Sequence, residues 1–189
     1  MRNEFEIEIR RGLIGTELGS CQFFDPLPEF TKYMTTLDAP IIDVGAGAGQ
    51  VTECLVDAGL KAVGIDMHRH MRPVYHVQMA DGTDFPYPED CVVMLCRPCH
   101  GAFAEQVIDQ AIARKVSMVL YVGLERNVED DLGDFLPRFK KVAIAVGLGG
   151  EAIWRMDLGK AHNRKDRRNH AVGVAGSSKR ASRKAGAHA

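Results

Sequence analysis

The residues with the clearest chemical potential form a glycine-rich turn, Asp43-Val-Gly45-Ala-Gly47-Ala-Gly49-Gln50, between a short apolar run and an amphipathic segment. Glycines permit a tight turn and let a ligand approach the backbone, because no Cβ stands in the way. The first N–H groups of a following helix have no partner inside the helix and favour a polar or anionic group. The next predicted strand ends at Asp66, whose carboxylate could accept hydrogen bonds from the two hydroxyls of a ribose. The pattern predicts a nucleoside site.

The spacing of the glycines disfavours a dinucleotide site. The dinucleotide fingerprint has its third glycine three positions after the second, and this chain has Gln50 there, which disfavours a nicotinamide-dependent oxidoreductase. The glycines instead lie two apart, and Asp43 precedes them within the strand. This arrangement resembles motif I of the class I S-adenosylmethionine-dependent methyltransferases. Residues 79–90 are similar to the family segment that ends the third strand and borders the adenine. The resemblance covers about residues 20–157.

The resemblance implies how S-adenosylmethionine would be held. The backbone of residues 45–49 would bind it, and Asp66 would hold its ribose. Asp81, with Asp84 as the alternative, would meet the adenine amino group. Residues 19–26 resemble the segment before motif I that touches the cofactor in some adenine-N6 DNA methyltransferases, which implies that Phe24 covers the cofactor. The cofactor-binding residues expected are Asp43, Gly45, Gly47, Gly49, Asp66, Asp81, Phe24 and Cys96.

The predicted fourth strand runs into Cys96-Arg97-Pro98-Cys99-His100, near the place where the resemblance puts the methyl acceptor. The two cysteines and the histidine match the spacing of haem attachment, but that chemistry needs an exported protein, and we identify no export signal in the sequence. They could also supply three zinc ligands. A structural zinc site needs four, and there is no second pair of cysteines. We therefore expect no haem, zinc or other metal.

Pro98 and Cys99 are also similar to the Pro-Cys motif of the cytosine-C5 methyltransferases, in which the cysteine thiolate attacks the base. On that interpretation the catalytic candidates are Pro98, Cys99 and His100. The chain lacks a counterpart of that family's recognition domain and of its later arginine-rich motif. Adenine-N6 methylation is not expected, because residues 96–99 do not match the Asn/Asp-Pro-Pro-aromatic motif. The interpretation we favour makes Cys96 and Cys99 small apolar residues that line the pocket.

Strands and helices alternate along most of the chain. The last two predicted strands are separated only by residues 147–151, too few for a crossover helix, so they should pair as an antiparallel hairpin. The pattern predicts an α/β fold: a Rossmann-like, doubly wound, mostly parallel sheet with a C-terminal antiparallel hairpin, in three α/β/α layers. The predicted strands are 5–9, 41–44, 62–65, 77–80, 91–95, 116–122, 142–146 and 152–156, and the predicted helices are 26–37, 50–58, 103–114 and 128–136.

The formal net charge of −1 combines two unlike parts. Residues 1–159 carry a net charge of −9 and are expected to form the methyltransferase-like domain. Residues 160–189 carry nine Lys and Arg against one acid and no apolar periodicity, so we expect a disordered basic tail. Such a tail could hold DNA or RNA through phosphate contacts, or could be a solvated segment without that role.

The sequence therefore predicts an S-adenosylmethionine-dependent methyltransferase whose acceptor is unresolved, with nucleic acid favoured by the tail. One alternative is a binding or virion-associated protein that keeps the fold without turnover. Another is a cytosine-C5-type enzyme that uses Cys99 as its nucleophile. The apolar runs are too short to cross a bilayer, and the N-terminus lacks the apolar core of a signal peptide, so we expect a cytoplasmic protein that does not enter membranes.

Overall fold

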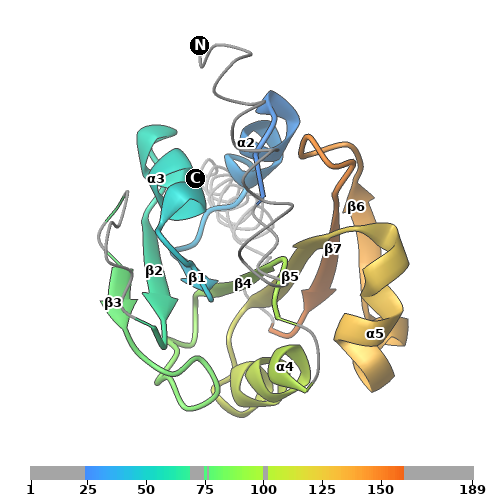
Figure 1. Cartoon of the computed structure of the whole chain (residues 1–189). Helices are drawn as coiled ribbons and strands as arrows, with labels where there is room; N and C mark the ends of the chain where they lie inside the picture. The colour runs from blue at the N-terminus through green and yellow to red at the C-terminus, as the bar shows by residue number, and fades with distance from the viewer. Residues whose placement is uncertain (1–23, 69–74, 76, 100–101, 160–189) are drawn as a thin grey trace, which may run out of the picture. The chain divides into compact units, whose positions relative to one another are not determined.

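A seven-stranded mixed sheet organises the part of the chain that the computed structural model describes, residues 24–68, 75, 77–99 and 102–159 (Figure 1). The strand order is β3-β2-β1-β4-β5-β7-β6. The first five strands are parallel, and β7 lies antiparallel between β5 and β6. The strands are β1 (Ile41–Val44), β2 (Ala62–Asp66), β3 (Val77–Met79), β4 (Val92–Cys96), β5 (Met118–Gly123), β6 (Lys140–Ala143) and β7 (Ala152–Asp157).

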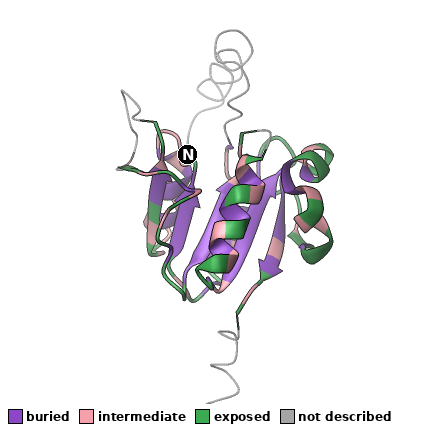
Figure 2. Ribbon diagram, turned by 90° about the horizontal axis from the view of Figure 1, so that it is seen from below, coloured by how far each residue is buried: buried purple, intermediate pink, exposed green. Residues whose placement is uncertain are grey.

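Strand side chains enter two separate apolar layers, because successive residues of a strand point to opposite faces. In β1, for example, Ile41 packs in one layer and Ile42 in the other. The central strands β1, β4 and β5 are therefore almost continuously apolar, as expected for parallel strands covered on both faces. Figure 2 shows these strands buried beneath a helix whose outer side is exposed.

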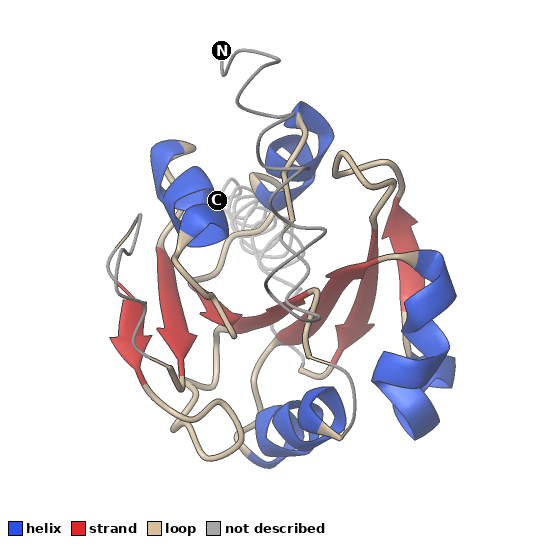
Figure 3. Ribbon diagram, viewed as in Figure 1, coloured by secondary structure: helices blue, strands red, loops and turns tan. Residues whose placement is uncertain are grey.

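The helices cover both faces of the sheet (Figure 3). The helices α2 (Pro28–Met34) and α3 (Gln50–Asp57) lie on one face. The helices α4 (Phe103–Ala113) and α5 (Val128–Leu132) lie on the other. This confirms the predicted three-layer, doubly wound architecture with its reversed C-terminal hairpin. None of the helices in the described segments has the length and apolar character that a membrane span requires.

Most predicted elements differ from the observed ones by one to three residues at an end, and two differ for a reason that the structure shows. The apolar run 142–146 does not form the sixth strand as a unit: β6 is Lys140–Ala143, and Val146 lies buried in the following loop. The chain turns away because Ala145 has a positive φ of 52° and the Val146 N–H donates to the Glu151 carbonyl oxygen. The predicted helix 128–136 is interrupted at Gly133, whose φ of 46° ends α5 before a 3₁₀ segment. The predicted strand 5–9 and the tail 160–189 fall outside the described residues.

Candidate functional site

The glycine-rich turn between β1 and α3 is fastened to the end of β2. The N–H groups of Gly45 and Ala46 both donate to the Ile65 carbonyl oxygen, at 2.9 and 3.0 Å. The turn needs positive φ values at Gly45, Gly47 and Gly49, of 72°, 57° and 87°. A side chain at these positions would be strained, which explains why glycine recurs at every second residue. The turn thus lies at the carboxyl edge of the sheet, over two neighbouring strands.

Asp66, the last residue of β2, ties this turn down through its side chain. Its Oδ2 accepts the Gly47 N–H at 2.8 Å, and its Oδ1 accepts the His68 N–H at 2.8 Å. The structure therefore brings together two residues that sequence analysis predicted for the same site. The Asp66 side chain is half-buried, so the carboxylate is partly accessible at the edge of the sheet.

Asp43 lies inside the sheet rather than at its surface. It is 1% exposed, and its Oδ2 accepts the hydroxyl of Thr52 at 2.7 Å, which joins β1 to the first turn of α3. Burial raises the pKa of this carboxyl to about 6; the Thr52 hydrogen bond lowers it, and the nearby Asp66 raises it. This geometry makes Asp43 a residue that positions the glycine-rich turn.

The segment after β3 carries the predicted adenine-binding residues. Asp81 is exposed and lies two residues beyond Met79, which pairs with Asp66 in the sheet. Its Oδ1 accepts the backbone N–H and the hydroxyl of Thr83, at 2.8 and 2.7 Å, and these bonds lower the pKa of its carboxyl. Asp84 is exposed in the same turn.

Gly82 has a role in this segment that sequence analysis did not identify. A Cβ there would lie 2.4 Å from Cγ1 of Val44, the last residue of β1. Only glycine lets the chain pass this closely over the end of β1. The signal in the sequence is the Asp81-Gly82 pair, which is typical of a turn and says nothing about this contact.

The residues at the end of β4 and just beyond it differ in exposure. Cys96 is partly buried, and burial raises the pKa of its thiol well above its usual value, with Asp43 and Glu151 adding to the effect. Cys99 is exposed, and Pro98 is half-buried. None of the described cysteines, which are Cys54, Cys91, Cys96 and Cys99, forms a disulfide. The third catalytic candidate, His100, lies outside the described residues.

Phe24 is a core residue in this structure. It is 4% exposed, and its ring meets that of Phe30 edge-on with the centroids 5.0 Å apart. It also packs on Gly147, where a Cβ would lie 2.4 Å from Phe24 Cε2. The ring therefore joins α2 to the loop between β6 and β7 and leaves little surface for a ligand.

A depression away from this edge is open to solvent. It lies between Thr83 and the outer side of α4, where Gln106, Asp109, Gln110 and Ala113 line it. It contains no cysteine or histidine, and no group of three or more metal-binding side chains gathers among the described residues. The glycine-rich turn at the carboxyl edge is the better candidate site.

The raised pKa of Asp43 predicts a specific pH dependence of stability. Between about pH 4 and 6 the folded chain holds a proton that the unfolded chain has lost, so this group destabilises the fold increasingly as pH rises, by roughly 2–3 kcal/mol above pH 6. Asp43→Asn removes the ionisation and keeps an acceptor for Thr52. The free energy of unfolding of Asp43→Asn minus that of the wild type should rise from pH 4 to pH 7, measured by urea unfolding.

Asp81→Asn is the matched control for that experiment. Hydrogen bonds lower the pKa of Asp81, so the stability that its carboxylate gives is lost only as pH falls below the usual pKa of an aspartate. The difference for Asp81→Asn should therefore change little between pH 5 and pH 7, where that for Asp43→Asn still rises. A pH-independent difference for Asp43→Asn would show that Asp43 ionises normally in the folded chain.

No protein-family model and no curated protein matches this chain. Among solved structures, one from work on the conversion of a disulfide bond into a thioacetal group during echinomycin biosynthesis matches with a TM-score of 0.50 and 12% identity, over 79% of this chain and 89% of that one. A 1,6-didemethyltoxoflavin-N1-methyltransferase of Burkholderia thailandensis, solved with S-adenosylhomocysteine bound, has a TM-score of 0.49 and 13% identity, over 82% and 85% of the two chains. Magnesium protoporphyrin IX methyltransferase of Synechocystis PCC 6803, solved with bound S-adenosylmethionine, has a TM-score of 0.46 and 12% identity, over 66% and 74%.

At these identities the similarity concerns the fold. The sheet order, with five parallel strands and the reversed β7 between β5 and β6, is the arrangement that the motif I resemblance implies. The chain has a Rossmann-like α/β fold with a reversed C-terminal strand pair, and the structure that matches at a TM-score of 0.50 is similar to it in fold.

Proposed function

We propose that this chain is an S-adenosylmethionine-dependent methyltransferase that binds its cofactor at the carboxyl edge of β1, β2 and β3. The observation that carries the proposal is the glycine-rich turn held against Asp66 by the Gly47 N–H. The site lies beside the point where the strand order reverses, between β1 and β4. Open α/β sheets bind ligands in the crevice at such a point.

Each part of the proposed site has a distinct task. The turn 45–49 brings backbone close to the ligand without an intervening Cβ, and Asp66 accepts hydrogen bonds from the ribose hydroxyls. Asp81 meets the adenine amino group as a hydrogen-bond acceptor. Asp43 and Gly82 are not ligand contacts in this proposal: they fix the turn and the adenine segment against β1.

When bound, S-adenosylmethionine supplies a methyl group that its sulfonium already activates, so transfer needs mainly in-line positioning of the acceptor. Residues 45–49 and Asp66 would hold the cofactor. An acceptor atom in line with the methyl–sulfur bond would take the methyl group and give up its proton to solvent, and the sulfonium would leave as a neutral thioether. We expect residues 96–99, at the end of β4 and just beyond it, to border this reaction.

Nucleic acid is the acceptor class that we favour. Residues 160–189 carry nine Lys and Arg against one acid, which suits a polyanion. The rest of the chain has a net charge of −9 and offers no such attraction in bulk. The expected place of action is the cytoplasm.

Two alternatives keep the same fold. Cys99 is exposed after β4, which is compatible with a nucleophile of the cytosine-C5 type, whereas Cys96 has a strongly raised thiol pKa. A binding or virion-associated protein without turnover would bind the cofactor and transfer no methyl group. Once an acceptor is known, Cys99→Ser tests the first alternative, and a turnover assay tests the second.

The cofactor assignment predicts a measurable loss in Asp66→Asn. Full-length wild type should bind S-adenosylhomocysteine in calorimetry and gain thermal stability with it, and NAD should do neither. Asp66→Asn should weaken binding by roughly tenfold or more, because a charged acceptor for the ribose hydroxyls is lost.

Asp57→Asn is a suitable control, since Asp57 is an exposed carboxylate at the end of α3, and its affinity should equal that of the wild type. Binding that Asp66→Asn leaves intact would contradict the site, and wild type that binds neither sulfur nucleoside would contradict the proposed enzyme.

The acceptor assignment predicts that the basic residues of the tail carry nucleic-acid affinity. Replacing Arg164, Lys165, Arg167 and Arg168 by Gln in the full chain should weaken RNA or DNA binding and reduce the salt slope of log K by about 3. Binding would be measured by fluorescence anisotropy at 50 and 200 mM salt. The control removes the same charge elsewhere, from the exposed side chains Lys32, Lys61, Arg114 and Arg126. Equal losses in both variants would contradict a specific role for the tail.

A further inference from the structure

Glu151 is a carboxylate that the fold buries almost completely. It immediately precedes β7 and is 1% exposed. Its Oε1 accepts the guanidinium of Arg97 at 2.9 Å, and its Oε2 accepts the Gly149 N–H at 3.0 Å. Its carbonyl oxygen accepts the Val146 N–H at 2.9 Å. A buried carboxylate requires such partners, because its desolvation is otherwise costly. Glu151 therefore closes the β6–β7 loop and joins it to the end of β4.

Glycines on this loop make room for the carboxylate. A Cβ at Gly147 would lie 2.3 Å from Glu151 Oε2, and one at Gly149 would lie 2.6 Å from Oε1. The sequence Gly147-Leu-Gly-Gly-Glu151 therefore does more than reverse the chain between β6 and β7. Its glycines enclose an acidic side chain that points toward β4.

Arg97, on the other side of the pair, has an unusual backbone. Its φ is 48°, in the left-handed region that non-glycine residues rarely adopt, and its N–H donates to the Val122 carbonyl oxygen at 2.8 Å. Such conformations are strained and persist where surrounding contacts impose them. The chain continues into Pro98, whose ring restricts φ, and then into the exposed Cys99. The backbone conformation at Arg97 therefore determines the direction in which Pro98 and Cys99 leave the strand.

We propose that Glu151 is a positioning residue: it holds Arg97 in this left-handed conformation and thereby fixes Pro98 and Cys99 at the side of the sheet where the methyl acceptor approaches. That this side receives the acceptor rests on the proposed function, whereas the effect of Glu151 on Cys99 can be measured without any cofactor. Glu151→Gln is the informative change, because it keeps the shape of the side chain and removes the negative charge that faces the guanidinium.

The test is the rate at which iodoacetamide alkylates Cys99 in the full chain, resolved by peptide mass spectrometry. Glu151→Gln should increase this rate by about threefold to tenfold, because segment 97–99 loses its ion pair and the Cys99 thiol, which is already exposed, is no longer held in one orientation. The partly buried Cys54 in α3 reports global loosening, and its rate should not change.

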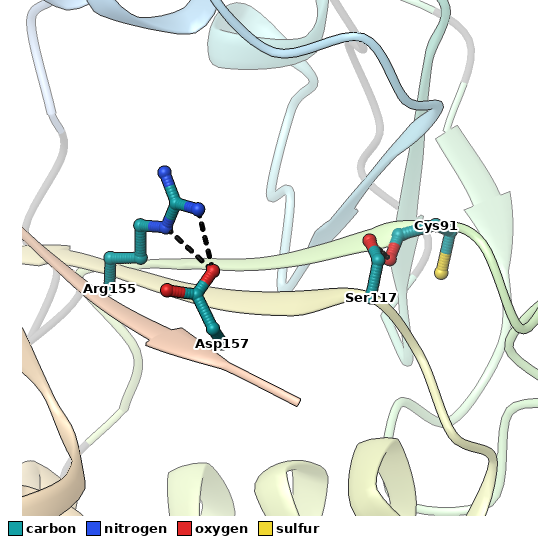
Figure 4. Close-up of polar contacts among 4 residues, drawn as sticks. All are labelled: Cys91, Ser117, Arg155 and Asp157. Atoms are coloured by element: carbon teal, nitrogen blue, oxygen red, sulfur yellow. Dashed lines mark hydrogen bonds and ion pairs between the residues drawn. The ribbon is translucent and has the colours of Figure 1, made fainter. Parts of the chain in front are cut away.

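A matched control removes another arginine–carboxylate contact. Arg155 donates to Asp157 Oδ1 from Nε at 2.8 Å and from a terminal nitrogen at 2.6 Å, in an exposed pair on β7 (Figure 4). Asp157 pairs with Met118, the first residue of β5, so it lies at the opposite edge of the sheet from Cys99. At that edge the Ser117 hydroxyl donates to the Cys91 carbonyl oxygen at 2.7 Å, and both residues are drawn in Figure 4. Asp157→Asn should leave Cys99 alkylation unchanged.

A second pair of variants keeps the test decisive if Glu151→Gln folds poorly. Glycine tolerates a positive φ without a holding contact, so in an Arg97→Gly background the substitution of Glu151 by Gln should no longer alter Cys99 alkylation. The double variant also lacks a buried unpaired carboxylate and should unfold at a higher temperature than Arg97→Gly alone.

Three results would overturn the positioning role: an unchanged Cys99 rate in Glu151→Gln, a parallel rise at Cys54, or an effect of the same size in the Arg97→Gly background. Failure of the wild type to bind S-adenosylhomocysteine would instead overturn the proposed function and leave the alkylation result valid.

Discussion

The hydrogen bonds that fasten the glycine-rich turn to the end of β2 are the constraint on which the site depends. The Ile65 carbonyl oxygen accepts two N–H groups of the turn, and the Asp66 carboxylate accepts a third from Gly47. These bonds require β1 and β2 to be parallel neighbours in register, with Val44 opposite Ile65. They also require positive φ values that only glycine adopts freely. The candidate site therefore depends on the register of the sheet. A shift of β2 by one residue would direct the Asp66 side chain to the other face of the sheet, away from Gly47.

The carboxyl edge of the sheet has two halves of different character. Around β1, β2 and β3 it presents backbone and exposed or half-exposed carboxylates, as a ligand site requires. Around β4, β5 and β7 polar side chains pair with one another: the partly buried Arg97 with the buried Glu151, and the buried Tyr121 with the buried Asp131. The Tyr121 ring extends over Gly123, where a Cβ would lie 2.4 Å from its hydroxyl. These contacts hold the side chains and loops of this half in one geometry, which suits the proposed reaction, because the acceptor must be held in line with the methyl group.

Much of this could be predicted from sequence because the signals are local. The apolar run of β1, the glycines after it and the short 147–151 connection correctly predicted the parallel sheet and its reversed end. The β6 boundary was wrong because an apolar run looks the same whether it pairs in a sheet or, as at Val146, packs in a loop. The roles of Gly82 and Glu151 could not be predicted from sequence for another reason. Gly82 acts through its contact with Val44, and Glu151 through its contact with Arg97, and both partners are distant in the sequence. The methyl acceptor of the proposed reaction cannot be predicted from the fold. Methyl transfer requires mainly that the acceptor be positioned, and many different surfaces on one fold can do this.

The central claim is that the edge formed by β1, β2 and β3 binds the adenosyl cofactor, and backbone amide NMR of the ¹⁵N-labelled full chain tests it most directly. During titration with S-adenosylhomocysteine, we predict saturable shifts concentrated at Gly45–Gly49, at Asp66–His68 and at Asp81–Thr83. Weaker shifts should reach Cys96, and residues on the outer side of α4, such as Gln106 and Asp109, should not respond. Absence of saturable shifts, or shifts centred on α4, would contradict the claim.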